Sequence, residues 1–162
     1  MFVLIRALVF ATLFIGFVLV YLPAQLLSSA GVARPAGFGF VQFAGMFICA
    51  VGAAIALWCI LAFAFVGRGT PAPFDPPKKL VMRGPYRFVR NPMYLGAGLA
   101  LAGAAFFYES IPFWLYTAGF LLVMHLFVIL YEEPALRQSF GEEYETYRRH
   151  VRRWLPTTGR KV

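Results

Sequence analysis

Two polar clusters interrupt a strongly apolar sequence, and they hold the side chains that could do chemistry. The first is the stretch 78–94, KKLVMRGPYRFVRNPMY, which carries five basic residues and no acidic one. The second is the pair Glu132-Glu133, which follows a long apolar run. Cations, carboxylates and tyrosines together suit a cofactor that bears charges of both signs. A metal is not expected, because His125 and His150 have no partner at metal-ligand spacing.

The end of the first cluster is predicted to begin a helix. Asn91 is a favoured N-cap residue, and Pro92 fits the first helical turn. We therefore expect the Asn91 side chain to cap an apolar helix that starts at Pro92. The second cluster has a purely structural alternative, in which nearby arginines neutralise two interfacial acids.

The composition places these clusters in a membrane protein. The 162 residues are 60% hydrophobic and 14% charged, with a mean hydropathy of +0.71. A soluble domain of this length has too little interior to bury so much apolar surface. The net charge of +8 would suit nucleic acid in a soluble protein. Here basic residues beside membrane spans explain it better, so we do not expect nucleic acid as a partner.

The hydropathy pattern predicts an all-α polytopic membrane protein formed by one domain, 1–162. Four transmembrane helices are expected, at about 2–22, 38–66, 92–108 and 113–131. A cleaved signal peptide is the alternative for the first of them. Pro23 is expected to end the first helix, and Glu132-Glu133-Pro134 the fourth. Gly45 and Gly52 give the second span a small-residue face for close helix packing.

The C-terminal segment 132–162 is predicted to contain an amphipathic cytoplasmic helix. Its apolar residues recur every three or four positions and form one stripe, at Leu136, Phe140, Tyr144, Tyr147 and Val151. Glu145 and Arg149 are expected to pair across one turn. The helix could lie in the membrane interface or pack back on the bundle.

The distribution of charge predicts the orientation. Of the 15 lysines and arginines, six lie in 67–91 and seven in 132–162, and four spans would put both segments on one side. The positive-inside rule then makes both termini and the loop 67–91 cytoplasmic, in a cell inner or plasma membrane if the source is bacterial. Anionic lipid headgroups are the expected partners of this basic loop.

Three motifs, in this order and spacing, resemble a known family. They are GPYRFVRNPMY at 84–94, LYEEP at 130–134 and FGEEYxxYxxxV at 140–151. Together they look like the membrane-embedded methyltransferases, which include isoprenylcysteine carboxyl methyltransferases and phosphatidylethanolamine N-methyltransferases. The resemblance covers 78–156, about half of the chain.

This resemblance implies binding of S-adenosylmethionine, with S-adenosylhomocysteine as product, and methyl transfer to a lipidic or small apolar acceptor from the membrane. The positions that it assigns to the cofactor are Lys78, Lys79, Leu80, Val81, Tyr86, Asn91, Pro92, Met93, Tyr94, Glu132 and, by analogy with the phospholipid enzymes, Glu133. No catalytic side chain is assigned, because direct methyl transfer requires no protein nucleophile.

Two positions depart from the isoprenylcysteine enzymes. Asn91 stands where they have histidine, as in the phospholipid enzymes, and Val128 stands where they have a substrate-side arginine. The second departure weakens carboxyl methylation as the reaction. Two other functions remain open, an NADPH-dependent membrane reductase of the sterol-reductase type and a non-enzymatic scaffold that binds anionic lipid.

Overall fold

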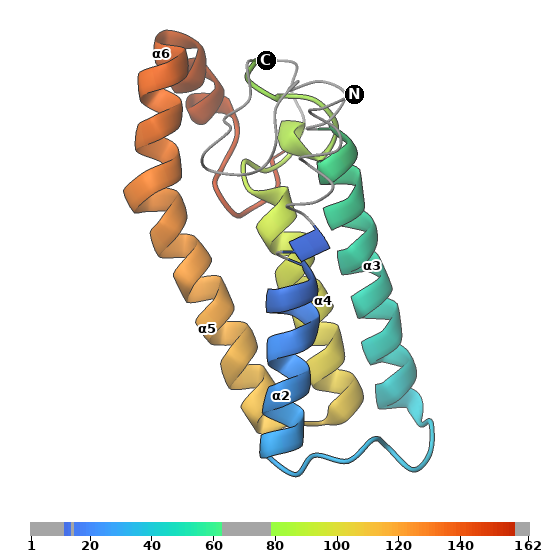
Figure 1. The fold of residues 1–162 in the computed structure, drawn as a ribbon. Coiled ribbons are helices and arrows are strands. Elements are labelled where there is room, and N and C mark those ends of the chain that lie inside the picture. The colour runs from blue at the N-terminus through green and yellow to red at the C-terminus, as the bar shows by residue number, and fades with distance from the viewer. Residues whose placement is uncertain (1–11, 14, 63–78, 158–162) are drawn as a thin grey trace.

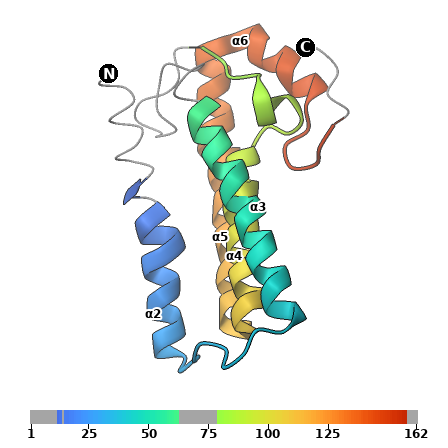
Figure 2. The same ribbon diagram turned by 90° about the vertical axis from the view of Figure 1, so that its right-hand side faces the viewer.

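The computed structural model describes residues 12–13, 15–62 and 79–157. These residues form helices joined by loops and turns, and the long helices run side by side (Figures 1 and 2). In chain order the elements are the π-helical η1 (Ile15–Tyr21), α2 (Leu22–Ser29), α3 (Phe40–Ala62), the 3-10 helix η3 (Gly84–Arg87), α4 (Pro92–Tyr108), α5 (Ile111–Phe127), the π-helical η4 (Val128–Glu132) and α6 (Glu133–His150). The predicted all-α fold is confirmed for this part of the chain.

Helices α3 and α4 form the closest contact of the bundle, through glycines on both sides. A Cβ on Gly45 would lie 2.6 Å from the Gly103 carbonyl oxygen, and a Cβ on Gly96 would lie 2.8 Å from the Gly52 carbonyl oxygen. Real Cβ atoms do not come this close, so only glycine allows the two backbones to touch. The small-residue packing face predicted for 38–66 is confirmed.

A tight turn reverses the chain between α4 and α5. Glu109 adopts a left-handed conformation (φ +46°) just after α4. Ser110 then caps α5, because its hydroxyl accepts a hydrogen bond from the Phe113 N–H at 3.4 Å. The hydroxyl of Tyr116 donates to the Val18 carbonyl at 2.6 Å and ties α5 to η1. Helices α4 and α5 thus form an antiparallel hairpin (Figure 1).

Two prolines that were expected to end helices do not end them. Pro23 and Pro134 both occupy the first turn of an α-helix that directly follows a π-helical segment, η1 or η4. A proline inside a regular helix clashes with the carbonyl four residues earlier and removes a hydrogen bond. The wider π turn gives the ring room, and the helix continues through it. The predicted helix ends at Pro23 and at Glu132-Glu133-Pro134 were therefore wrong.

Among the described residues, two helices are long and apolar enough to cross a membrane. They are Phe40–Ala62, with mean hydropathy 2.3, and the continuous helix Ile111–His150, with mean hydropathy 2.1. The apolar helices Gly16–Ser29 and Pro92–Tyr108 are shorter than 18 residues in the described part. The number of four spans therefore stays a prediction, and most of the first predicted span, 2–22, lies outside the described residues.

Helix α6 bends sharply at Gly141, where the backbone leaves helical geometry (φ +49°, ψ −122°). Its second half turns across the end of the bundle (Figure 2). The predicted stripe packs there, with Tyr144, Tyr147 and Val151 buried together against Leu80 and Met82 of the loop, and with Leu136 and Phe140 beside them. An additional position in the membrane interface stays a prediction.

The ion pair predicted between Glu145 and Arg149 was wrong. Glu145 lies between Arg137 and Arg148 instead, at 3.0 Å from each. The bend at Gly141 brings Arg137, from the first half of α6, within reach of the second half. A spacing rule for a straight helix does not anticipate this contact.

Candidate functional site

Two contacts fix the loop before α4 against α3. Val81 and Tyr86 are 5% and 7% exposed and pack against Cys59 of α3. Gly84 has φ +61° and lies against Trp58, where a Cβ would be 3.2 Å from the indole nitrogen. A residue with a side chain would be strained in this backbone conformation. The loop is thus held against α3 just before it enters α4.

A hydrogen bond joins the two predicted clusters. The hydroxyl of Tyr94, in the first turn of α4, donates to Oε2 of Glu132 at 3.1 Å. These residues lie 38 positions apart, and Glu132 ends η4. Tyr94 is 8% exposed, whereas Glu132 is half-buried. In the described part of the chain, this phenol is the one hydrogen-bond donor to the Glu132 carboxylate, so its other oxygen can accept from a ligand.

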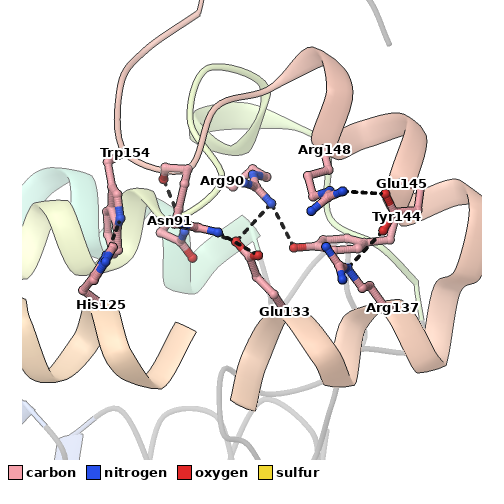
Figure 3. Close-up of polar contacts among 10 residues, drawn as sticks. Arg90, Asn91, His125, Glu133, Arg137, Tyr144, Glu145, Arg148 and Trp154 are labelled. Carbon is pink, nitrogen blue, oxygen red and sulfur yellow. Dashed lines mark hydrogen bonds and ion pairs between the residues drawn. The ribbon is translucent and has the colours of Figure 1, made fainter. Parts of the chain in front are cut away.

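Glu133 has a different role from its neighbour. Its carboxylate binds Arg153 through two hydrogen bonds, of 2.6 Å and 3.0 Å, and its Oε1 lies 3.1 Å from a terminal nitrogen of Arg90 (Figure 3). The side chain of Glu133 is 8% exposed. Arginines therefore neutralise Glu133. The structural alternative, neutralisation of both acids by nearby arginines, thus holds for Glu133 and not for Glu132.

The two neighbouring carboxylates also differ in their affinity for protons. Glu132 lies just beyond the predicted span 113–131. Burial raises its pKa, and the charge of Glu133 raises it further. The hydrogen bond from Tyr94 opposes these effects but does not outweigh them. Burial alone would raise the pKa of Glu133 too, but the hydrogen bond from Arg153 and the charges of Arg90, Arg153 and Arg137 outweigh it and lower that pKa. Glu133 is the more firmly ionised acid.

Asn91 does not act as the predicted helix cap. Its side chain makes no hydrogen bond to the first turn of α4. Its amide nitrogen donates instead to the carbonyl of Arg153 at 3.2 Å (Figure 3). A residue 62 positions away thus competes successfully with the local cap. The predicted helix start at Pro92 is confirmed, but the predicted role of the Asn91 side chain there was wrong.

Residues 151–157, here named the C-terminal strap, connect the loop before α4 to helices α5 and α6. The Arg90 N–H donates to the Arg152 carbonyl at 2.9 Å, and the Thr157 N–H donates to the Phe88 carbonyl at 2.8 Å. The indole N–H of Trp154 donates to Nδ1 of His125 on α5 at 2.9 Å (Figure 3). Because indole can only donate, Nδ1 of His125 carries no proton in this contact.

The remaining predicted cofactor residues divide between two packing clusters and the surface. Val81, Tyr86 and Met93 pack with Cys59 against α3, whereas Leu80 packs with the tyrosines of α6. Pro92 is buried and Lys79 is exposed, and Lys78 lies outside the described residues. The structure thus joins Tyr94 to Glu132, and it surrounds Glu133 and Asn91 with the C-terminal strap.

Four residues of this region were not predicted from the sequence. Arg90, His125, Arg153 and Trp154 are brought together by contacts that span 20 to 62 positions. The contacts of the strap had no signal in the sequence, because no periodicity relates 151–157 to the loop.

Comparison with known proteins identifies the family. Residues 40–143 match the family described as "Phospholipid methyltransferase". The chain belongs to this family. The matched range contains α3, the described part of the loop, α4, α5, η4 and the first part of α6. The resemblance stated from the motifs is therefore confirmed, and family membership together with the two long apolar helices supports a membrane methyltransferase.

Curated relatives agree with this family at modest identity. Proteins named "Probable protein-S-isoprenylcysteine O-methyltransferase" from Oryza sativa subsp. indica and subsp. japonica are each 32% identical over 126 residues, which covers 74% of this chain and 63% of theirs. An uncharacterized protein of Haemophilus influenzae is 40% identical over 63 residues, 39% of this chain and all of that protein. No solved structure matches. The chain thus spans less than two thirds of its rice relatives.

Proposed function

We propose that the protein transfers a methyl group from S-adenosylmethionine to a lipidic or small apolar acceptor at the membrane. The observation that carries this proposal is the hydrogen bond between Tyr94 and Glu132 at 3.1 Å. It joins two of the three motifs of the methyltransferase resemblance, 84–94 and 130–134, at one point, where α4 begins and η4 ends. The family match and the names of the rice relatives support the same reaction class. They do not favour the reductase.

The groups at this site suit S-adenosylmethionine. The oxygen of Glu132 that Tyr94 leaves unused can accept hydrogen bonds from an ammonium group or from ribose hydroxyls. The Tyr94 ring offers an aromatic surface, which attracts a cationic sulfonium. Tyr86 is proposed as a second aromatic wall, fixed against Cys59 and Val81. The loop residues Lys79, Leu80 and Val81, with Pro92 and Met93, would complete the surroundings.

The chain's task in such a reaction is positioning. S-adenosylmethionine supplies an electrophilic methyl group, which an acceptor takes by in-line displacement. No protein group has to form a covalent bond, so orientation and exclusion of water provide the acceleration. The phenol of Tyr94 orients the Glu132 carboxylate, and the pair formed by Glu133 with Arg90 and Arg153 fixes the neighbouring backbone. Both effects keep the site in one geometry before the substrates bind.

The proposal is tested by binding of S-adenosylhomocysteine to the detergent-solubilised protein. Glu132→Gln keeps the size of the side chain and removes its charge, and it should weaken binding by about tenfold or more, as expected for a hydrogen bond to a charged group. Tyr94→Phe should weaken binding less, because it removes one hydroxyl that orients the carboxylate. Isothermal titration calorimetry measures both effects.

Glu145→Gln is the matched control, since it makes the same chemical change at a half-buried ion pair away from Tyr94. It should leave binding within twofold of wild type. If wild type does not bind S-adenosylhomocysteine, or if Glu132→Gln binds as wild type does, the cofactor proposal is wrong. Labelled-methyl transfer against total membrane lipid and small thiols, amines and carboxylates then identifies the acceptor.

A further inference from the structure

The C-terminal strap reaches beside α5 to a depth that lies inside the predicted fourth span. It runs from the end of α6 back toward the bundle (Figures 1 and 2). There the indole N–H of Trp154 donates to Nδ1 of His125 at 2.9 Å, with the ring centroids 5.8 Å apart (Figure 3). At about 1.5 Å per residue, His125 lies roughly 21 Å along α5 from Ile111, whereas the hydrocarbon core is about 30 Å thick. In the predicted span, Trp154 therefore lies close to the boundary between acyl chains and headgroups, where tryptophan is enriched in membrane proteins.

Exposed apolar side chains adjoin Trp154. Leu155 is 63% exposed, and Pro156 beside it is exposed too. The N–H and the hydroxyl of Thr157 both donate to the Phe88 carbonyl, at 2.8 Å and 3.0 Å, and attach this part of the strap to the loop before α4. Phe88 is itself 41% exposed. Adjoining segments of the loop and the strap thus present one set of apolar side chains, here named the strap patch: Phe88, Trp154, Leu155 and Pro156.

The charges beside the strap patch are positive. Neither 79–91 nor 151–157 contains an acidic residue. Arg87 and Arg152 are exposed, and the Arg87 guanidinium lies 5.0 Å from the centre of the Phe88 ring. Arginine side chains near a membrane surface keep their charged ends at the headgroup level while apolar neighbours go deeper. The patch therefore combines an apolar centre with a cationic edge.

The backbone of the strap is paired in the way that this depth requires. Irregular backbone in apolar surroundings must find its hydrogen-bond partners within the protein. The carbonyl of Arg152 accepts from the Arg90 N–H at 2.9 Å, and the carbonyl of Arg153 accepts from the Asn91 amide at 3.2 Å. These polar groups are thus bonded to the loop, whereas the apolar side chains of Leu155 and its neighbours are exposed.

We propose that the strap patch is an interfacial anchor that binds anionic phospholipid. Its apolar side chains lie against the upper acyl chains, and Arg87 and Arg152 lie at the headgroup phosphates. The occupant is lipid because Trp154 contacts His125, a residue inside the predicted span, and the two arginines select negative headgroups. The proposal goes beyond methyl transfer and is independent of the cofactor that the protein binds.

The depth of the patch is tested in lipid nanodiscs with an environment-sensitive fluorescent label on Leu155→Cys. Phosphatidylcholine with a nitroxide high on its acyl chain should quench the label about twofold or more, because interfacial segments lie within about 10 Å of the acyl boundary. Ser139→Cys, an exposed position just before the bend in α6, is the control, and its label should be quenched by aqueous acrylamide instead. Wild type gives the background from its free thiols.

A matched pair of variants tests the choice of headgroup. The label on Leu155→Cys reports binding of dihexanoylphosphatidylglycerol and of dihexanoylphosphatidylcholine to the detergent-solubilised protein. Binding should favour the anionic lipid, and Arg152→Gln should reduce this preference by about fivefold, as for one arginine at a charged membrane surface. Arg34→Gln makes the same change at an exposed arginine at the opposite end of the molecule and should leave the preference within twofold (Figure 1).

Three results would overturn the anchor. The first is a label at position 155 that acrylamide quenches and the nitroxide lipid does not, which places the strap in water. The second is an equal preference for the anionic lipid in Arg152→Gln and in Arg34→Gln. The third is energy transfer between labels at position 155 on separate chains, which shows a second copy on the patch instead of lipid. Phe88→Cys provides a second labelling position if Leu155→Cys does not fold.

Discussion

Glu132 and Glu133 are neighbours with opposite tasks. Glu132 is half-buried and, within 12–13, 15–62 and 79–157, accepts one hydrogen bond, from Tyr94, which leaves acceptor capacity for a ligand. Glu133 is buried and fully engaged by Arg90 and Arg153. One residue therefore offers a carboxylate, and the other stabilises the arrangement that presents it. Substitution of the two residues should change different properties of the protein.

Glu133→Gln should lower stability in a pH-dependent manner. The folded-state pKa of Glu133 is lowered, so its ionised form stabilises the fold above the unfolded-state pKa of about 4.3, and this contribution is lost as the pH falls through the lower folded-state value. Removing one partner of a buried ion pair costs about 3 kcal/mol. Thermal unfolding in detergent should show the largest difference from wild type near pH 7.

The same scan at decreasing pH provides the check. The unfolding temperatures of wild type and Glu133→Gln should converge below about pH 4. Glu145→Gln removes a more exposed pair, 35% exposed at Glu145, and should cost less than about 1 kcal/mol at every pH. If the difference in unfolding temperature between wild type and Glu133→Gln grew as the pH falls, it would contradict this account.

At the scale of elements, the contact between α3 and α4 sets the position of the site. A Cβ at Gly52 would meet the backbone of α4, with the Gly96 carbonyl oxygen at 2.5 Å. Tyr94 lies two residues before Gly96, so a separation of these helices moves the phenol directly. The close helix contact thus connects membrane packing to the hydrogen bond between Tyr94 and Glu132.

Gly52→Ala should therefore destabilise the protein, by about 1–3 kcal/mol for overpacking. Gly119→Ala on α5 is the control, because nothing lies within 4 Å of its Cβ position. A glycine inside a helix costs roughly 0.5–1 kcal/mol relative to alanine, so the control should be neutral or stabilising. Thermal unfolding in detergent measures both. Equal behaviour of the two variants would contradict the close contact.

The elements also show what the sequence could predict. Hydropathy and small residues predicted α3, α4 and α5, because long apolar runs and glycine faces are local properties. The continuation of the helices through Pro23 and Pro134 could not be predicted, since each depends on a π segment before the proline. The motifs predicted Tyr94 and Glu132. They did not predict Arg153 or Trp154, whose partners depend on how the chain folds back after Gly141.

At the scale of the whole molecule, the described chain has two unlike ends. The loop before α4, the second half of α6 and the C-terminal strap gather at one end (Figure 1). The loop between α2 and α3, which contains Arg34, lies with the turn between α4 and α5 at the other. The described parts of the basic segments predicted to be cytoplasmic, 79–91 and the second half of α6 with the strap, thus share one end with the candidate site (Figure 1). This agrees with a site that meets a water-soluble cofactor.

This arrangement predicts which ends are accessible from which side of a membrane. Arg149→Cys should react with an impermeant maleimide only from the cytoplasmic side of sealed vesicles, and Arg34→Cys only from the other side. Both positions are exposed. Wild type gives the background from the free thiols of Cys49 and Cys59, both on α3. Labelling of both variants from one side would contradict the predicted orientation.

The π turn η4 has a consequence for how the length of this protein can change. A π turn holds one residue more than a regular helical turn needs. Deleting one residue from Val128–Tyr131 would therefore restore an ordinary helical turn, in which the Pro134 ring would clash with the carbonyl four residues earlier. An insertion would rotate Glu133 away from Arg90. Descendants of this chain can therefore shorten here only if Pro134 is also replaced, and they cannot lengthen without losing the pair.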